Sequence, residues 1–241
     1  MADPTPQSLL ERAVEQARLG DTQSAEAALT QCLEMDPHNT RALVNLGTLL
    51  SARKQHAAAE AALRKAVALV NNVETVSALA RALLTAGKRE DAEALFSQVV
   101  ARIPGYAPAL LGLAEIKEEQ GEIAVAATLC RLAWQAEPQD IEVGIKYATL
   151  AADGDPDEPA RVMAALLADP GLNNAKRLRV LGALLMYKEF AERKTHGLMP
   201  YHATSLDEMF FRYAAQDFAR YRAIALSMFE HAPLDPGTLT A

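Results

Sequence analysis

Residues 42–67 read ALVNLGTLLSARKQHAAAEAALRKAV, and residues 75–100 read TVSALARALLTAGKREDAEALFSQVV. Placed one above the other, the two stretches carry apolar or small residues at matching places: Leu43 and Val76, Leu46 and Leu79, Gly47 and Ala80, Ala59 and Ala92, Leu63 and Phe96. Within each stretch, two runs of helical apolar spacing flank a polar turn. We therefore expect each stretch to fold as a helix, a turn and a second helix.

The same pattern recurs along most of the chain. One set of small residues repeats at steps of 34, 33, 34 and 34, and a second set keeps this pitch: Ala25, Ala59, Ala92, Ala126 and Ala160, then Ala13, Gly47, Ala80, Ala114, Ala148 and Gly182. Turn formers fall between the helices at Gly20, Gly87 and Gly121, with Lys54 in the equivalent place. A period of this length indicates stacked helix pairs, in which each unit buries its apolar face against its neighbours.

These residues give the chain a resemblance to the tetratricopeptide repeat family. The resemblance covers residues 6–174 in five units that start near Pro6, Thr40, Val73, Ala107 and Ile141, of which the first and fifth are the least similar. It implies an all-α fold, a right-handed α-solenoid of helix-turn-helix repeats. The first helices of the units would line a concave groove that holds a peptide segment or a partner helix.

The C-terminal part of the chain has a different composition. Nine of the 12 Phe and Tyr residues lie from Tyr187 onward, and residues 175–241 carry a net charge of +2 against −9 for residues 1–174. We expect residues 175–232 to form helices that cap or extend the array, followed by a tail over 233–241. Aromatic residues there form a candidate second docking surface, for a partner or for a second copy in a homodimer: Phe210, Phe211, Tyr213, Phe218 and Tyr221.

Composition and charge exclude several partners. With 24 Lys and Arg against 31 Asp and Glu, the chain has no basic excess to neutralise nucleic-acid phosphates. Its longest run without a charged residue, from Ile103 to Ala114, has 12 residues, whereas a membrane span needs roughly 20. Two cysteines and no signal-peptide pattern favour the cytoplasm. We expect neither a nucleic-acid partner nor a membrane.

No group of residues predicts catalysis or a bound cofactor. Cys32 and Cys130 fall at core positions of second helices, where a thiol is a small apolar side chain. His196 and His202 lack the spacing of metal ligands, and the aspartates around residue 155 lack the glycine and glutamate of a calcium loop. Glycines are scattered and form no phosphate-binding loop. The chain is predicted to be non-enzymatic, without a metal or other cofactor.

Within the implied groove, polar residues on the first helices are the candidate partner-binding residues: Arg41, Asn45, Thr48, Ser77, Arg81, Thr85, Glu115, Glu119 and Lys146. Asn45 and Arg81 stand out because an amide and a guanidinium hold backbone or carboxylate groups. Residues 107–140 carry a net charge of −4, which favours a partner with a basic stretch.

Members of the family that bind chaperone tails clamp a terminal carboxylate with Lys, Asn and Arg side chains. Only Asn45 matches that set, because apolar or acidic residues stand at the other places: Leu10, Val14, Glu74 and Ala78. The resemblance therefore argues against chaperone tails. The leading hypothesis is a protein-interaction module. The alternative is the N-terminal recognition region of a larger methyl-, glycosyl- or sulfotransferase.

Overall fold

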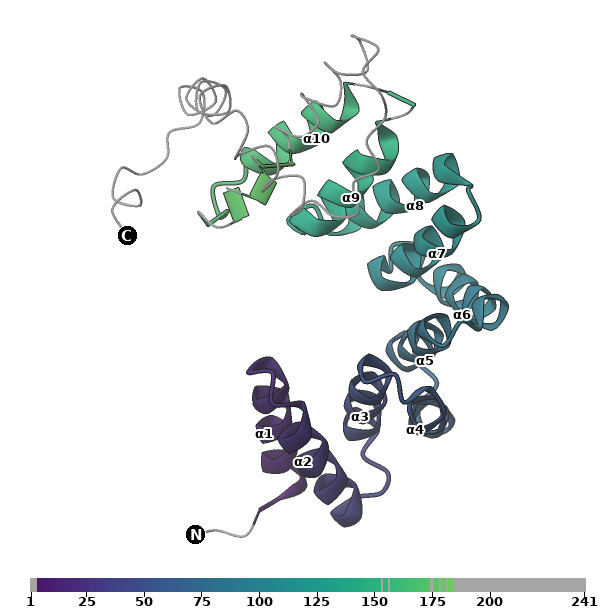
Figure 1. The fold of residues 1–241 in the computed structure, drawn as a ribbon, viewed down its shortest axis with the longest axis vertical. Coiled ribbons are helices and arrows are strands. Elements are labelled where there is room, and N and C mark those ends of the chain that lie inside the picture. The colour runs from purple at the N-terminus through teal and green to yellow at the C-terminus, as the bar shows by residue number, and fades with distance from the viewer. Residues whose placement is uncertain are drawn as a thin grey trace. The chain divides into compact units, whose positions relative to one another are not determined.

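A computed structural model describes residues 4–152, 154–155, 157–173, 176–177, 179–180 and 182–183. Its helices follow one another in tandem, and no β-strand occurs in these ranges (Figure 1). The chain divides into two compact units, residues 1–120 and 121–241, which we describe separately. The predicted all-α array of helix pairs is confirmed.

Seven helices make up the first unit: α1 (Pro6–Arg18), α2 (Thr22–Met35), α3 (Thr40–Ala52), α4 (His56–Leu69), α5 (Val73–Thr85), α6 (Arg89–Arg102) and α7 (Ala107–Glu119). The second unit contains α8 (Ile123–Ala136), α9 (Ile141–Ala151) and α10 (Glu158–Leu167). Within the first unit each helix contacts the next, and α3 also contacts α5, as α5 contacts α7. The predicted boundary between residues 174 and 175 lies outside the described residues.

Short polar side chains start several first helices. Thr5 and Asn72 each accept a hydrogen bond from the third backbone N–H of the helix that follows, and Asn39 and Asp140 cap α3 and α9 in the same way. These caps satisfy backbone donors that have no partner inside the helix. The starts of the helix pairs are therefore fixed locally as well as by packing.

The turn inside each of the first four helix pairs contains a residue with a left-handed backbone conformation. Gly20, Gly87 and Gly121 adopt φ values of +83°, +79° and +80°, and Lys54 adopts +60° at the equivalent place. A side chain is disfavoured in this conformation because its Cβ crowds the following carbonyl oxygen. Lys54 is the one described residue other than glycine with positive φ, so repeat two carries backbone strain that the others avoid.

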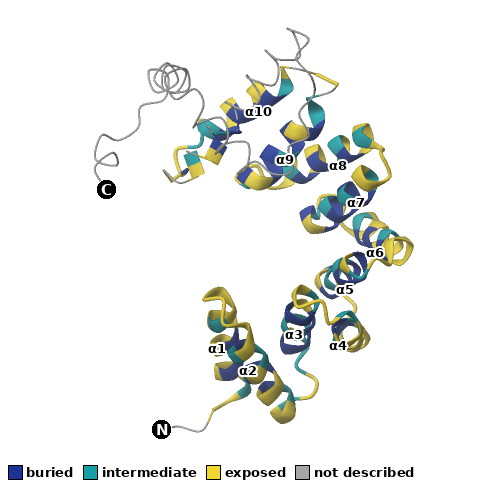
Figure 2. Ribbon diagram, in the orientation of Figure 1, coloured by how far each residue is buried: buried dark blue, intermediate teal, exposed yellow. Residues whose placement is uncertain are grey.

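Small residues on the second helices allow close packing. Ala25, Ala59, Ala92 and Ala126 are fully buried, and apolar faces of the helices turn inward while polar faces stay exposed (Figure 2). At Gly47 on α3, an added Cβ would lie 2.4 Å from Cγ of Leu63 on α4, which leaves no room for a methyl group. Small residues therefore mark close approaches of helices at these positions.

Repeat five departs from this pattern. Ala160 is exposed, and α10 instead buries Pro159, Val162, Met163 and Leu166, which is a helical face displaced by one residue from that of the other second helices. Leu166 comes to lie against Gly144, where an added Cβ would be 2.9 Å from its Cδ1. Leu166 of α10 thus lies at a glycine whose equivalents in repeats two to four are Leu43, Val76 and Leu110.

Consecutive repeats of the first unit are joined by ion pairs that we call the glutamate ladder: Glu26 with Arg53, Glu60 with Lys88, and Glu93 with Lys117. Each glutamate follows the buried alanine of its second helix, and each cation belongs to the next repeat. Arg64 of the same helix also binds Glu60, at 2.8 Å. The glutamates of the ladder recur at the period of the repeat, whereas their cations occupy different places in the repeats that follow.

Among the described residues, no helix combines the length and apolar character needed to cross a membrane.

Replacing Lys54 by glycine should stabilise the protein. Glycine adopts positive φ without the Cβ clash, and we expect a gain of about 0.5–1 kcal/mol in the free energy of unfolding. Urea denaturation followed by circular dichroism measures it. Gly87→Ala is the converse variant and should lose a similar amount. A Lys54→Gly chain no more stable than wild type would contradict the strain at this turn.

The ladder predicts a pH-dependent contribution from Glu60. Hydrogen bonds from Lys88 and then Arg64 lower the pKa of Glu60 below its ordinary value of 4.5. Because the folded-state pKa is depressed, the stabilisation is complete above about pH 4.5 and is lost as pH falls through the lowered value. Glu60→Gln should therefore reduce thermal stability at pH 7, by up to about 1 kcal/mol, and should approach wild type once the pH falls below the lowered pKa of Glu60. A pH-independent difference would show that the ion pairs are not responsible.

Candidate functional site

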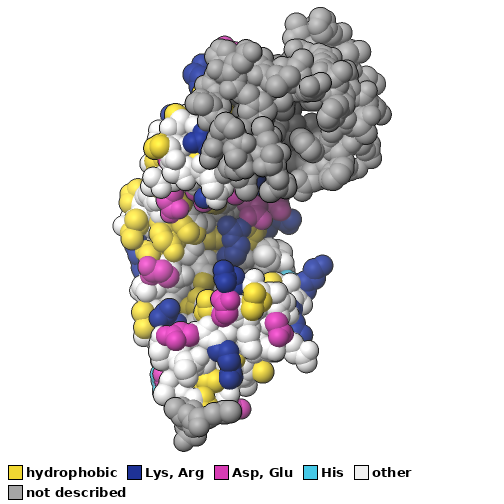
Figure 3. Space-filling model, turned by 90° about the vertical axis from the view of Figure 1, so that its left-hand side faces the viewer, with side chains coloured by type: hydrophobic (Ala, Val, Ile, Leu, Met, Phe, Trp, Pro, Cys, Tyr) yellow, Lys and Arg dark blue, Asp and Glu magenta, His cyan; other side chains and the backbone are white. Residues whose placement is uncertain are grey.

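The predicted groove residues lie on the first helices of repeats two to five. Arg41, Asn45 and Thr48 are on α3, Ser77, Arg81 and Thr85 on α5, Glu115 and Glu119 on α7, and Lys146 on α9. We call the eight residues on α3, α5 and α7 the first-helix face. Basic and acidic side chains alternate over the described surface in Figure 3 and form no continuous patch of one sign.

The structure brings Arg81 and Glu115 together in an ion pair between α5 and α7. The Arg81 guanidinium also lies 5.5 Å from the centre of the Phe96 ring, within cation–π range. Phe96 is fully buried and packs so closely on α7 that a Cβ at Gly112 would be 2.4 Å from the ring. Arg81 is therefore held by a charge on one side and a fixed aromatic ring on the other.

A hydroxyl pair joins α3 to α5. The Ser51 and Thr85 side-chain oxygens are 2.7 Å apart. Since Thr85 Oγ1 donates to the carbonyl of Ala82 at 2.9 Å, the Ser51 hydroxyl is the donor to Thr85. Thr85 thus contributes to the contact between first helices, and Ser51 is a member of this contact that the sequence did not single out.

Three side chains of α3 keep their hydrogen-bonding groups open. Arg41 and Thr48 are exposed and Asn45 is half-buried, and none of them makes a side-chain hydrogen bond or ion pair with the described residues. Their guanidinium, hydroxyl and amide groups can donate to carbonyl and carboxylate oxygens. This part of the first-helix face offers the most polar capacity to a ligand.

Three of the acidic groups behind the prediction of a basic partner are engaged within the protein. Glu115 binds Arg81, and Glu119 binds Arg89, which stands at the start of α6. Asp140 caps α9 by accepting from the backbone N–H of Glu142 at 2.9 Å. These ion pairs and this cap reduce the negative charge available to a partner.

Two further predicted residues are less accessible. Ser77 is buried, with 5% of its surface exposed, because it faces the packed side of α5. Lys146 is half-buried on α9 and belongs to the second unit. Neither presents its whole side chain to a ligand.

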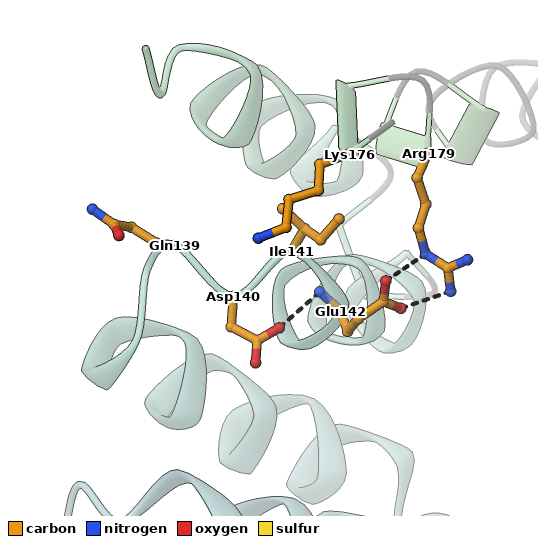
Figure 4. A pocket seen from close by; sticks show the side chains of 6 residues that line it. All are labelled: Gln139, Asp140, Ile141, Glu142, Lys176 and Arg179. Carbon is orange, nitrogen blue, oxygen red and sulfur yellow. Dashed lines mark hydrogen bonds and ion pairs between the residues drawn. The ribbon is translucent and has the colours of Figure 1, made fainter. Parts of the chain in front are cut away.

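A pocket of about 500 Å³ opens beside the start of α9 (Figure 4). It is lined by Gln139, Asp140, Ile141, Glu142, Lys176 and Arg179. Arg179 binds Glu142 through two nitrogen atoms, with Nη2 2.7 Å from Oε2. Because Asp140 and Glu142 are already bound within the protein, this pocket offers little chemistry for a substrate.

The cysteines lie where the sequence placed them. Cys32 and Cys130 are fully buried, and burial raises the pKa of the Cys32 thiol, which keeps it protonated. In the parts of the chain that the structure describes, no three His, Cys, Asp or Glu side chains gather to hold a metal. His196, His202 and the aromatic docking surface from Phe210 to Tyr221 lie outside the described residues.

Sequence reasoning missed the contacts that join the repeats. Glu26, Glu60 and Glu93 recur at steps of 34 and 33, each directly after an alanine of the first periodic set. This period was the signal that could have revealed the glutamate ladder. Phe96 enters the sequence analysis only as an apolar residue of the repeat, although it also supports Arg81.

Comparison with known proteins agrees with this arrangement. A family model described as tetratricopeptide repeat matches residues 16–83 and 83–150. No curated protein matches the sequence.

Solved structures resemble the fold. A thermophilic tetratricopeptide repeat protein of Thermus thermophilus is 21% identical, with a TM-score of 0.63 over 75% of this chain and 100% of its own. PilF of Pseudomonas aeruginosa is 17% identical, with a TM-score of 0.63 over 90% and 96%. MamA of Desulfovibrio magneticus is 16% identical, with a TM-score of 0.54 over 71% and 99%.

At these identities the solved structures support the fold alone, whereas the two matches of the family model cover more than half of the sequence at the period of the helix pairs. The chain belongs to the tetratricopeptide repeat family.

Proposed function

We propose that this protein is a non-enzymatic interaction module that binds a peptide segment or a helix of another protein on its first-helix face. The tetratricopeptide fold is in general a scaffold for protein interactions. The observation that carries the proposal is the open polar group of α3, formed by Arg41, Asn45 and Thr48, beside a part of the same face that is already fixed.

The two parts of the face have different tasks in this proposal. One pair, Arg81 and Glu115, joins α5 to α7, and a second pair, Ser51 and Thr85, joins α3 to α5. These two contacts hold the surface in one arrangement before a partner arrives. A surface arranged in advance loses less conformational entropy on binding. The open donors of α3 then supply the contacts that select the partner.

The hydrogen-bonding groups of α3 indicate which kind of partner this face can bind. Arg41 and Asn45 offer N–H donors, so the partner should present carboxylate or backbone carbonyl oxygens opposite α3. The basic partner expected from the fourth unit is less favoured, since Glu115 and Glu119 are each held by an arginine. The free carbonyls of an extended segment suit these donors well.

A pull-down from native extract tests the site with the double variant Arg41→Glu, Asn45→Ala. Both side chains lack partners within the described residues, so their replacement should leave the fold intact, which circular dichroism checks. A partner identified by mass spectrometry should bind the variant at least about tenfold more weakly in isothermal titration, because charge-assisted hydrogen bonds are lost.

Lys65→Glu is the matched control. Lys65 is an exposed residue of α4, without an ion pair in the described structure, and its charge reversal should leave the affinity unchanged. If both variants retain every partner of the wild type, the first-helix face is not the binding site.

A further inference from the structure

The glutamate ladder stops after the third link. Glu26, Glu60 and Glu93 each bind a cation of the following repeat, but the residue 34 positions after Glu93 is Ala127. Ala127 lies on α8, and the next repeat begins with α9. The second unit therefore lacks a carboxylate at the place where the first unit has one at every junction.

A pocket of about 590 Å³ occupies this place. Its walls come from α8, from α9 and from the turn after α9: Ile123, Ala124, Ala127, Thr128, Arg131, Tyr147, Leu150, Ala151, Gly154, Asp155 and Glu158. In the first unit, the ladder glutamate of each second helix pairs with a cation of the following repeat. Ala127, which lines this pocket, has no carboxylate to form such a pair.

Arg131 is a positively charged residue that lines this pocket, close in sequence to the place of the missing carboxylate. It follows Ala127 by four residues, as Arg64 follows Glu60, and Arg64 Nη2 binds that glutamate at 2.8 Å. Arg131 is exposed, and within the described residues it makes neither a hydrogen bond nor an ion pair. An arginine that lines a pocket and makes no ion pair with the described residues can bind a carboxylate.

The acidic side chains of the pocket already have partners within the protein. Glu158 accepts a hydrogen bond from the Tyr147 hydroxyl at 2.5 Å and also binds Arg161, which holds Asp155 as well. The carboxylates are thus engaged by Tyr147 and Arg161. Apolar side chains such as Ile123 and Leu150 complete the walls and can contact the methylene groups of a bound side chain.

We propose that this pocket binds an aspartate or glutamate side chain of a partner protein, with Arg131 as its ion-pair partner in the place of the absent ladder glutamate. This site is separate from the first-helix face and does not depend on that proposal.

Nuclear magnetic resonance titration of the full-length, ¹⁵N-labelled chain tests the site. The probes are two blocked tripeptides, acetyl-Ala-Glu-Ala-amide and acetyl-Ala-Gln-Ala-amide. The Glu peptide should shift the backbone amide signals of residues 127, 131, 147 and 150 with a saturable, millimolar dissociation constant. The Gln peptide should bind about fivefold or more weakly, because it lacks the charge. Trp134, which stacks on Tyr147 at 5.9 Å and is the single tryptophan of the chain, provides a second readout by fluorescence.

Three variants separate the pocket from general charge effects. Arg131→Gln should weaken the Glu peptide about fivefold. Arg64→Gln removes the corresponding arginine of repeat two, which already has its partner, and should leave binding unchanged. Ala127→Glu restores the ladder carboxylate beside Arg131 and should abolish binding while the chain stays folded. Absence of saturable shifts at the pocket, equal affinity for both peptides, or an Arg131→Gln chain that binds like wild type would each overturn the proposal.

Discussion

Close approach of helices at buried alanines is the constraint on which the other features of this protein depend. Ala25, Ala59, Ala92 and Ala126 are completely buried near the starts of the second helices. A larger side chain there would force helices apart, because protein interiors have no room for added methylene groups. With the helices at this distance, the Ser51–Thr85 and Arg81–Glu115 pairs can form between successive first helices.

The periodic part of the fold could be predicted from the sequence, because helices that pack at a fixed pitch require small residues at the same spacing. Lys54 shows that even a turn without glycine could be placed by this spacing. Repeat five shows the limit. Ala160 keeps the period but is exposed, since the face of α10 is displaced by one residue and depends on contacts that period alone does not reveal.

The candidate site was less predictable than the fold. Sequence position indicates which helix carries a side chain, but not whether another side chain has already used its polar groups. Arg81 stands out in the sequence analysis and Arg41 does not, yet Arg81 is bound to Glu115 and lies over Phe96, whereas Arg41 makes no ion pair within the described residues. Such pairings join residues 34 apart on different helices, so they depend on geometry that only the assembled repeats provide.

The glutamate ladder also bears on how an array of this kind can change in length. Repeats two and three each carry a cation for the glutamate before them and a glutamate for the cation after them, so each is compatible with a copy of itself on either side. Duplication or loss of a whole unit within this region conserves every link, whereas a shift of one residue breaks them. The series of ion pairs ends after Glu93, because Ala127 has no carboxylate that could bind a cation of the following repeat. Growth of the array by copying is therefore compatible with its N-terminal part, and the junction of α8 and α9 is a specialised end to that series.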